Sequence, residues 1–268
     1  MFARSVQENL AEMPPRSLKM IMKRSNPRAM FYGKRQKKAA MHEENSASGD
    51  DAVDTDTALA FFRSMFNSAK FNDRVPPIIF KHQLYSVVNN RTQVDRDINR
   101  LQEKKEIKLF HFDDESENCL VFTEDYKKCL RNSEHCPHDI TEKFISVLVD
   151  GSTDLTFNKT TMSSWGFQEK DITKLLHSGL LTVRDIGSWW LAIPGAGIFM
   201  KCYRKGRDAM LRTIRTSRRK EILMQELEGR KLQAVEPLGM KYHLYDILGA
   251  EHVIKIQTTS GVLLRYDM

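Results

Sequence analysis

The stretch GSWWLAIPGAGIFMKCYRKGRDAMLRTIRTSRRK, residues 187–220, holds the strongest structural signal in the sequence. Its first part, Ser188 to Ile193, is a run of aromatic and aliphatic residues that predicts a β-strand, and Pro194 ends this run. The sequence PGAG breaks the chain, and a helix is predicted from about Ile198 onward. The stretch therefore predicts a strand followed by a long helix.

The predicted helix has two different faces. With about 100° per residue, one set of cations falls within about 40° of a single line along the helix. These cations are Lys201, Lys205, Arg212, Arg215 and Arg219. Tyr203, Met210 and Ile214 fall on the opposite side, where they can pack on a core.

The basic stripe suits a polyanion, because regularly spaced cations on a rigid helix can contact successive phosphates and release their counterions. A solvated helix face is the usual explanation for a run of charges and stays as the alternative. Residues 201–220 contain nine Lys or Arg and one acid, whereas solvated helices usually mix signs. The whole chain is also basic, with a formal net charge of +7. The single sign favours a binding surface.

Composition limits the class of protein. A chain of 268 residues with 41% hydrophobic residues can build two or three domains with cores of their own. We find no apolar run of the length that spans a membrane and no apolar segment typical of a secretory signal near the first residue. We therefore expect a protein that is neither secreted nor embedded in a membrane.

Cysteine and histidine spacing predicts neither a metal site nor a cofactor. The four cysteines include no pair at the C-x-x-C spacing, so we expect free, buried thiols. His135, Cys136 and His138 lie close together, but no second half at zinc-finger spacing accompanies them. No catalytic or metal-binding residue is predicted.

Residues 1–54 predict a disordered tail with segregated charges. Residues 16–38 hold nine Lys or Arg and no acid, and residues 43–56 hold six acids and no base. The cluster Lys34, Arg35, Lys37 and Lys38 has the density of a nuclear import signal. It is equally compatible with a tail that adds non-specific affinity for DNA.

Residues 55–130 predict a first winged-helix domain. Thr55 or Thr57 can cap its first helix, and Thr92 with Asp95 resembles a capping box. The predicted order is a helix, a strand at 78–80, helices at 82–88 and 92–105, and a hairpin over 107–123. Residues 92–105 would be the recognition helix and residues 113–118 the wing.

The charges of this predicted recognition helix are mixed. It carries the cations Arg96, Arg100 and Lys104, and acids lie at positions 95, 97, 103 and 106. The predicted wing is acidic as well. Because a helix that reads a DNA groove should not repel phosphate, this unit is interpreted as a protein-interaction module rather than a DNA reader.

The same order of elements repeats twice more. Residues 139–194 predict a second winged helix with a short wing, and Gly179 is expected to follow a helix C-terminus. Residues 195–268 predict a third, entered through the basic helix and continuing into an apolar helix over 222–228. The predicted fold class is α+β, mostly helical, with three tandem winged-helix domains after a disordered basic tail.

Several segments resemble one family closely. They include TVRDIGSWWLAIPGAGIFMKCYRKGR, RKEILMQELEGRK, YHLYDILGA and TTSGVLLR, together with PPIIFKHQLYSVV and NRTQVDRDINRLQEKKEI in the first unit. These segments are similar to the vertebrate nuclear family filed as serine/threonine-protein kinase 19 and better described as winged-helix repair factors. The resemblance covers residues 55–268, and the tail shares only a basic cluster.

The resemblance implies a nuclear, non-enzymatic protein that binds double-stranded DNA in transcription-coupled nucleotide excision repair. The resemblance also implies a bridge between stalled RNA polymerase II, with its Cockayne-syndrome and UV-stimulated scaffold factors, and the helicase complex TFIIH, and it suggests a homodimer. The family's DNA-contacting positions match Lys201, Arg215 and Arg230. Arg230 lies outside the stripe and rests on the resemblance alone.

Two other functions are each suggested by a single feature. A protein-interaction adaptor with incidental DNA binding is favoured by the mixed charges of the first unit. A protein kinase is suggested by the family name, but the sequence lacks a glycine-rich phosphate loop, an H-R-D loop with its Asn, and D-F-G. Arg184 and Asp185 imitate R-D without the downstream Asn, and residues 194–197 hold only two glycines. We therefore expect no enzyme activity.

Overall fold

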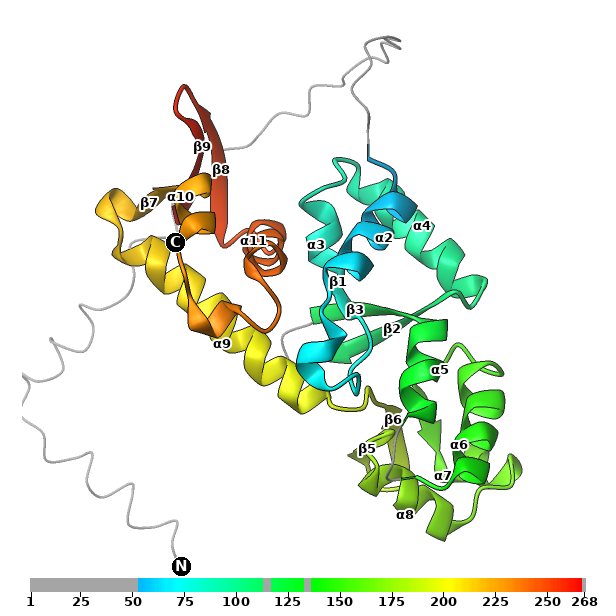
Figure 1. Ribbon diagram of the computed structural model, residues 1–268. Helices are drawn as coiled ribbons and strands as arrows, with labels where there is room; N and C mark the ends of the chain where they lie inside the picture. The colour runs from blue at the N-terminus through cyan, green and yellow to red at the C-terminus, as the bar shows by residue number, and fades with distance from the viewer. Residues whose placement is uncertain (1–52, 113–116, 133–135, 267–268) are drawn as a thin grey trace, which may run out of the picture. The chain divides into compact units, whose positions relative to one another are not determined.

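Three antiparallel sheets, each of three strands, follow one another along the chain (Figure 1). The structure is a computed structural model that describes residues 53–112, 117–132 and 136–266. In every sheet the strand that is last in sequence lies between the other two. The repeated order of a strand, helices and a hairpin confirms the predicted α+β class.

The first segment contains the elements predicted for it and one helix more. Its elements are α2 (Thr55–Met65), β1 (Ile79–Phe80), α3 (Lys81–Tyr85), α4 (Arg91–Glu103), β2 (Ile107–Phe112), β3 (Glu117–Phe122) and α5 (Thr123–Arg131). Helix α5 was not predicted. Its residue Tyr126 is fully buried and donates a hydrogen bond to the carbonyl of Ala192, 2.7 Å away, which ties the first segment to the second.

Both predicted helix caps of this segment were wrong. Asp54 caps α2 by accepting from the amide of Asp56, and the Thr55 hydroxyl is buried and donates to Asp97 instead. Asn90 caps α4, one residue before the helix begins. Side chains that sequence rules assign to local caps are here used for contacts between helices.

The second segment follows the prediction closely. Its elements are α6 (His138–Phe144), a π-helical turn (Ile145–Val149), β4 (Thr156–Asn158), α7 (Lys159–Ser164), α8 (Glu169–His177), β5 (Leu181–Asp185) and β6 (Ser188–Leu191). Gly179 has a φ of 71° just beyond α8, as expected for the residue after a helix end. The β5–β6 wing is short, with Ile186 fully exposed at its tip.

The third segment differs from the prediction at its centre. Its elements are α9 (Ala196–Thr216), β7 (Glu221–Leu223), α10 (Met224–Gly229), α11 (Met240–Gly249), β8 (Val253–Thr258) and β9 (Gly261–Tyr266). Ile222 and Leu223 were predicted as the start of an apolar helix, but they lie in β7. Pairing of Glu221 to Leu223 with β9 satisfies their backbone groups in the sheet, which the local sequence pattern does not show.

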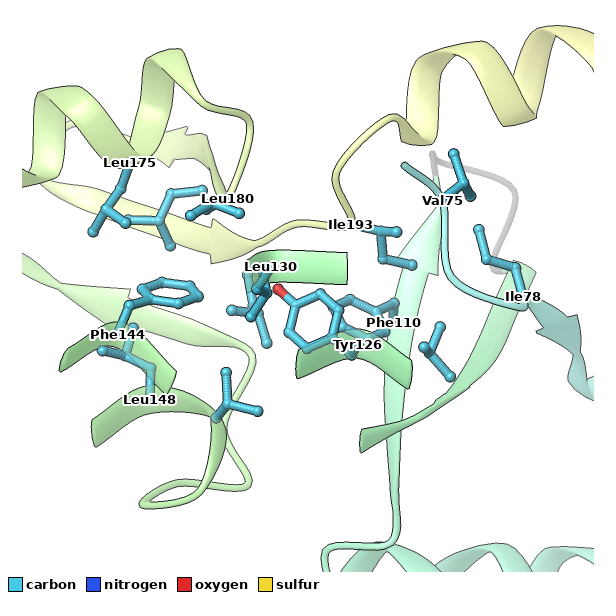
Figure 2. Close-up of a cluster of buried hydrophobic side chains, with 14 of the residues drawn as sticks. Val75, Ile78, Phe110, Tyr126, Leu130, Phe144, Leu148, Leu175, Leu180 and Ile193 are labelled. Carbon is cyan, nitrogen blue, oxygen red and sulfur yellow. The ribbon is translucent and has the colours of Figure 1, made fainter. Parts of the chain in front are cut away.

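The largest hydrophobic core is shared by all three segments. Figure 2 shows part of it, with Phe110, Tyr126 and Leu130 of the first segment, Phe144 of the second, and Ile193, which follows β6. The first and third segments each have a second core of their own. The described residues form a single compact unit, so the division into three domains stays a prediction.

Two further predictions concern the tail and membrane-spanning helices. The basic cluster Lys34, Arg35, Lys37 and Lys38 and the rest of residues 1–52 lie outside the described residues. Among the helices that the structure describes, we find none that combines the length and the apolar character needed to cross a membrane.

Candidate nucleic-acid interface

Helix α9 is amphipathic, and its apolar side is buried along the length of the helix. Tyr203 belongs to the shared core, whereas Met210 and Ile214 belong to the core of the third segment. Gly206 lies between them, and a Cβ there would come within 2.1 Å of Nε2 of His243 on α11. The glycine therefore permits the close crossing of α9 and α11. The predicted inward-facing residues Tyr203, Met210 and Ile214 are confirmed.

The opposite side of α9 is exposed and basic. We call four of its exposed cations the α9 basic face: Lys201, Lys205, Arg212 and Arg215. Arg219 was predicted to continue this line, and that prediction was wrong. Ser217 has an extended backbone, with φ −71° and ψ 163°, and ends the helix, so Arg219 lies exposed in the turn that leads to β7.

Three members of the α9 basic face have no counter-charge within the described part of the chain. Within the residues that the structure describes, Lys201, Lys205 and Arg212 have neither an ion pair nor a side-chain hydrogen bond. Asp208 is the one acid in α9. A phosphate could therefore bind these three cations without breaking an ion pair to any residue that the structure describes.

Arg215 and Arg230 are held by neighbouring groups. Arg215 donates to the Tyr266 hydroxyl at 2.8 Å, and its guanidinium lies 4.8 Å from the centre of that ring, so β9 orients it. Arg230, just beyond α10, pairs with Glu226 one helical turn earlier, with 2.6 Å between nitrogen and oxygen. The structure brings Arg215 onto the α9 basic face, whereas Arg230 lies on a separate element and is partly neutralised.

The helix in the recognition position of the third segment is covered. Helix α11 packs on α3 of the first segment. The Tyr242 hydroxyl donates to the carbonyl of Ile78 at 2.8 Å, and the Gln83 amide donates to the carbonyl of Tyr242 at 3.1 Å. A Cβ on Gly249 would come within 1.9 Å of the His82 carbonyl oxygen. Most residues of α11 are therefore buried against other helices, whereas one side of α9 is exposed and basic.

A buried carboxylate joins these helices. Asp246 on α11 is fully buried and accepts hydrogen bonds from His82 Nε2 at 2.7 Å, from the Tyr203 hydroxyl at 2.6 Å and from two nitrogens of Arg207 at 2.7 and 2.8 Å. Burial alone would raise the pKa of Asp246, but the hydrogen bonds from Arg207 and His82 hold it well below its usual value. The ionised carboxylate therefore fixes α3, α9 and α11 together.

The neighbouring His243 is buried and neutral. Burial lowers the pKa of His243 to about 4, so the ring carries no charge at neutral pH. Neither ring nitrogen has a hydrogen-bond partner among the described residues. The ring lies beside Tyr203, with 6.1 Å between ring centres, and against Gly206. Protonation of His243 would place a charge inside the α9–α11 contact.

Helix α4, the predicted recognition helix of the first segment, has most of its charges paired inside the protein. Arg91 pairs with Glu251, at the end of α11. Asp95 accepts from Tyr85 at 2.6 Å and pairs with Lys81 at 2.9 Å. Further pairs join Arg100 to Asp56 and Asp97. The cations Arg96 and Lys104 are exposed.

The residues that imitate enzyme motifs have structural positions. Asp185 ends β5 as part of the predicted hairpin, and the guanidinium of Arg184 lies 4.7 Å from the Trp190 ring centre. Residues 194–197 form the entry to α9, with Gly195 at a φ of 72°. Cys136 packs in the shared core. Each of these residues contributes to turns or packing.

Comparison with known proteins supports the sequence resemblance. A model of the family described as inactive serine-threonine protein kinase 19 matches residues 61–266. The chain is 39% identical over 239 residues to a human protein named winged helix repair factor 1. The aligned residues make up 88% of this chain and 94% of the human protein. Proteins of the same name from mouse and Xenopus laevis are 40% and 39% identical, over 75% and 81% of this chain and 81% and 85% of theirs.

Proposed function

The chain belongs to the inactive serine-threonine protein kinase 19 family, and on that premise we propose that it is a non-enzymatic repair factor that binds double-stranded DNA through the α9 basic face. The observation that carries this proposal is the set of three exposed cations on one side of α9 that lack an internal partner within the described residues. The relatives' name, winged helix repair factor, supports the role in repair.

Binding should depend on phosphate contacts rather than on base sequence. The buried α11 leaves no recognition helix in the third segment for groove reading, and phosphate contacts position a protein without reading sequence. Affinity would then fall steeply with salt, because the release of counterions from each neutralised phosphate contributes about 0.9 to the slope of log affinity against log salt.

The proposed cellular role is a bridge in transcription-coupled nucleotide excision repair. In this role three tandem winged-helix domains would hold DNA near stalled RNA polymerase II, with its Cockayne-syndrome and UV-stimulated scaffold factors, and would meet TFIIH. The proposed location is the nucleus. Homodimerisation belongs to the same proposal. These elements rest on the family resemblance.

A protein-interaction adaptor is the second candidate, and the charges of α4 favour it. Most of the acids and cations of α4 pair with one another or with other elements, which leaves a surface of mixed sign. Such a surface suits a protein partner better than a phosphate backbone. Both roles can coexist, since α4 and α9 are separate surfaces.

A titration of duplex DNA by fluorescence anisotropy at several salt concentrations tests the proposal. The variant Lys205→Glu/Arg212→Glu reverses two exposed cations of α9, and Arg96→Glu/Lys104→Glu makes the same change in net charge on α4. We expect the α9 variant to lose at least about 30-fold in affinity at low salt and about two units of salt slope, and the α4 variant to lose less than about threefold. Circular dichroism checks that both are folded. Equal losses in the two variants would reject α9 as the site.

A further inference from the structure

Three helices occupy the recognition position of a winged helix, directly before a hairpin, and their surfaces differ. Helix α4 precedes β2–β3, α8 precedes β5–β6 and α11 precedes β8–β9. The exposed side of α4 carries the acid Glu103 as well as cations, and most residues of α11 are buried against other helices. Helix α8 packs on β5, and Figure 1 shows it beside the β5–β6 hairpin. Its outward side resembles neither of the other two.

Helix α8 is amphipathic, and its outward side carries no acid. Ile172 and Leu175 are buried and mark its inner side. At about 100° per residue, four exposed residues fall within about 50° of the line opposite this pair. We call them the α8 face: Lys170, Thr173, Lys174 and His177.

The acids of α8 lie in its first turn and are bound there by other groups. Glu169 pairs with Lys159, with 2.5 Å between oxygen and nitrogen. Asp171 accepts from the backbone amide of Gln168 at 3.0 Å, which caps the start of the helix. Neither carboxylate is therefore available to neutralise a cation further along the helix.

The cations of the α8 face are not paired within the protein. Among the residues that the structure describes, the side chains of Lys170, Lys174 and His177 have neither an ion pair nor a hydrogen bond. Thr173 donates its hydroxyl to the carbonyl of Glu169 at 2.8 Å. An anionic ligand could reach both lysines without displacing an acid of the described chain.

The hairpin next to α8 ends in an apolar tip. Ile186 is fully exposed, and Val183 is 69% exposed. Arg184 is exposed as well, and its guanidinium lies 4.7 Å from the centre of the Trp190 ring. Asp185 accepts from the amide of Ile186 at 2.7 Å, so this carboxylate belongs to the turn. Isoleucine is among the apolar residues that proteins insert into the minor groove of DNA.

We infer that the α8 face and the tip of the β5–β6 hairpin form a second binding surface for duplex DNA. Its charge is complementary to phosphate, because Lys170, Lys174 and Arg184 are exposed while the acids of both elements are bound locally. Ile186 adds an apolar contact in the minor groove. The surface belongs to the second segment, so the inference does not depend on the α9 basic face.

The first test reverses the two lysines in the full chain. Lys170→Glu/Lys174→Glu should lower the affinity for duplex DNA about tenfold at low salt and reduce the salt slope by about two in fluorescence anisotropy. The matched control is Arg96→Glu/Lys104→Glu on α4, which makes the same change in net charge and should lose less than about threefold. Circular dichroism checks that both variants are folded.

The second test separates the apolar tip from the charges. Ile186→Ser should lower the affinity about threefold and leave the salt slope unchanged, because an apolar contact releases no counterion. Ile186→Leu keeps the apolar tip and should bind like the parent. If the lysine variant has the affinity and the salt slope of the α4 control, the inference is overturned, and a protein becomes the partner that fits this surface.

The inference and the proposed function can fail separately. If Lys205→Glu/Arg212→Glu binds DNA like the parent and the α8 variant loses affinity, the proposed use of α9 fails and the second surface stands. The reverse result rejects the second surface alone. When both surfaces contact one duplex, the combination of the four substitutions should bind more weakly than either double variant.

Discussion

Helices α4 and α9 both carry several cations on their exposed sides, yet the two surfaces are built differently. On α4, Arg91 and Arg100 pair with acids, and Asp95 is bound by Lys81. On α9, the exposed cations Lys205 and Arg212 have no ion pair among the described residues. The number of cations therefore says less about a binding surface than the number left without an internal partner.

The same contrast occurs within α9. Arg207 points to the buried side and binds Asp246 through two nitrogens, so it resembles the paired cations of α4. Arg207 is structural, whereas the cations on the other side are available to a ligand. The predictions below test this division, from the largest expected effect to the smallest.

Replacing Asp246, the buried partner of Arg207, should give the largest loss of stability. Asp246→Ala leaves Arg207, His82 and the Tyr203 hydroxyl without their acceptor, and a broken buried pair typically costs about 3–5 kcal/mol. We expect a loss of that size in urea unfolding. Asp208→Ala, on the exposed side of α9, is the control and should change the free energy of unfolding by less than about 0.5 kcal/mol. Similar losses for the two variants would contradict the structural role of Asp246.

The buried face of α9 should also respond to acid. The folded pKa of His243 is about 4, below the usual value of 6.5, so between these values the unfolded chain binds a proton that the folded chain does not. Stability contributed by neutral His243 is complete above pH 6.5 and falls as the pH drops toward 4. We expect a loss of about 2 kcal/mol between pH 7.5 and pH 5 in urea unfolding. His243→Leu should lack this loss, and an equal loss in that variant would assign it to other groups.

Freeing a paired cation should strengthen DNA binding if that cation faces the duplex. Glu226→Gln removes the partner of Arg230, and we expect duplex affinity to rise about two- to fivefold at low salt. Glu228→Gln removes one negative charge from the same helix and is the matched control, with a rise below about twofold. The same rise in both variants would show a general effect of net charge, and Arg230 would then have no specific contact.

The smallest effect should come from making α4 more like α9. Asp95→Asn/Glu103→Gln removes two acids from α4 and leaves Arg96 and Lys104 in place. If single-sign charge on a helix is sufficient, anisotropy should show up to about threefold tighter duplex binding and an increase in salt slope of less than one. A gain that matches the loss in the α9 variant would mean that α4 also lies in the DNA interface.

Hydrophobic periodicity predicted most elements correctly, because each has a local signal. The buried stripe of α9, the pairing of β5 with β6 and the glycine after α8 could all be inferred from residue spacing. Helix α5 was not predicted, because charged residues surround its buried residues Tyr126 and Leu130 in the sequence. These two residues are buried because they pack on another segment, which the local sequence does not show. The strand β7 escaped for a similar reason, because its partner β9 lies about forty residues later.

The candidate site was predicted only in part. The spacing of charges identified Lys201, Lys205, Arg212 and Arg215, but it could not show which cations are paired. The buried Asp246 beneath Arg207 depends on contacts distant in sequence. The end of α9 at Ser217 was missed because residues 217–220 continue the helical pattern of charge, while the structure turns toward β7. One feature of the sequence could have indicated the structural role of Arg207, because on the helical wheel this residue lies away from the line of the other cations.

The two cores that α9 joins have a mechanical consequence. In its first half, Phe199 and Tyr203 pack with Phe80 in the shared core, and in its second half Ile214 packs in the third segment's own core. A helix clamped at both halves cannot roll about its axis without disturbing both cores. Torque applied by a bound duplex would thus be transmitted to the first segment. The orientation of α9 in the protein would then determine the orientation of the DNA.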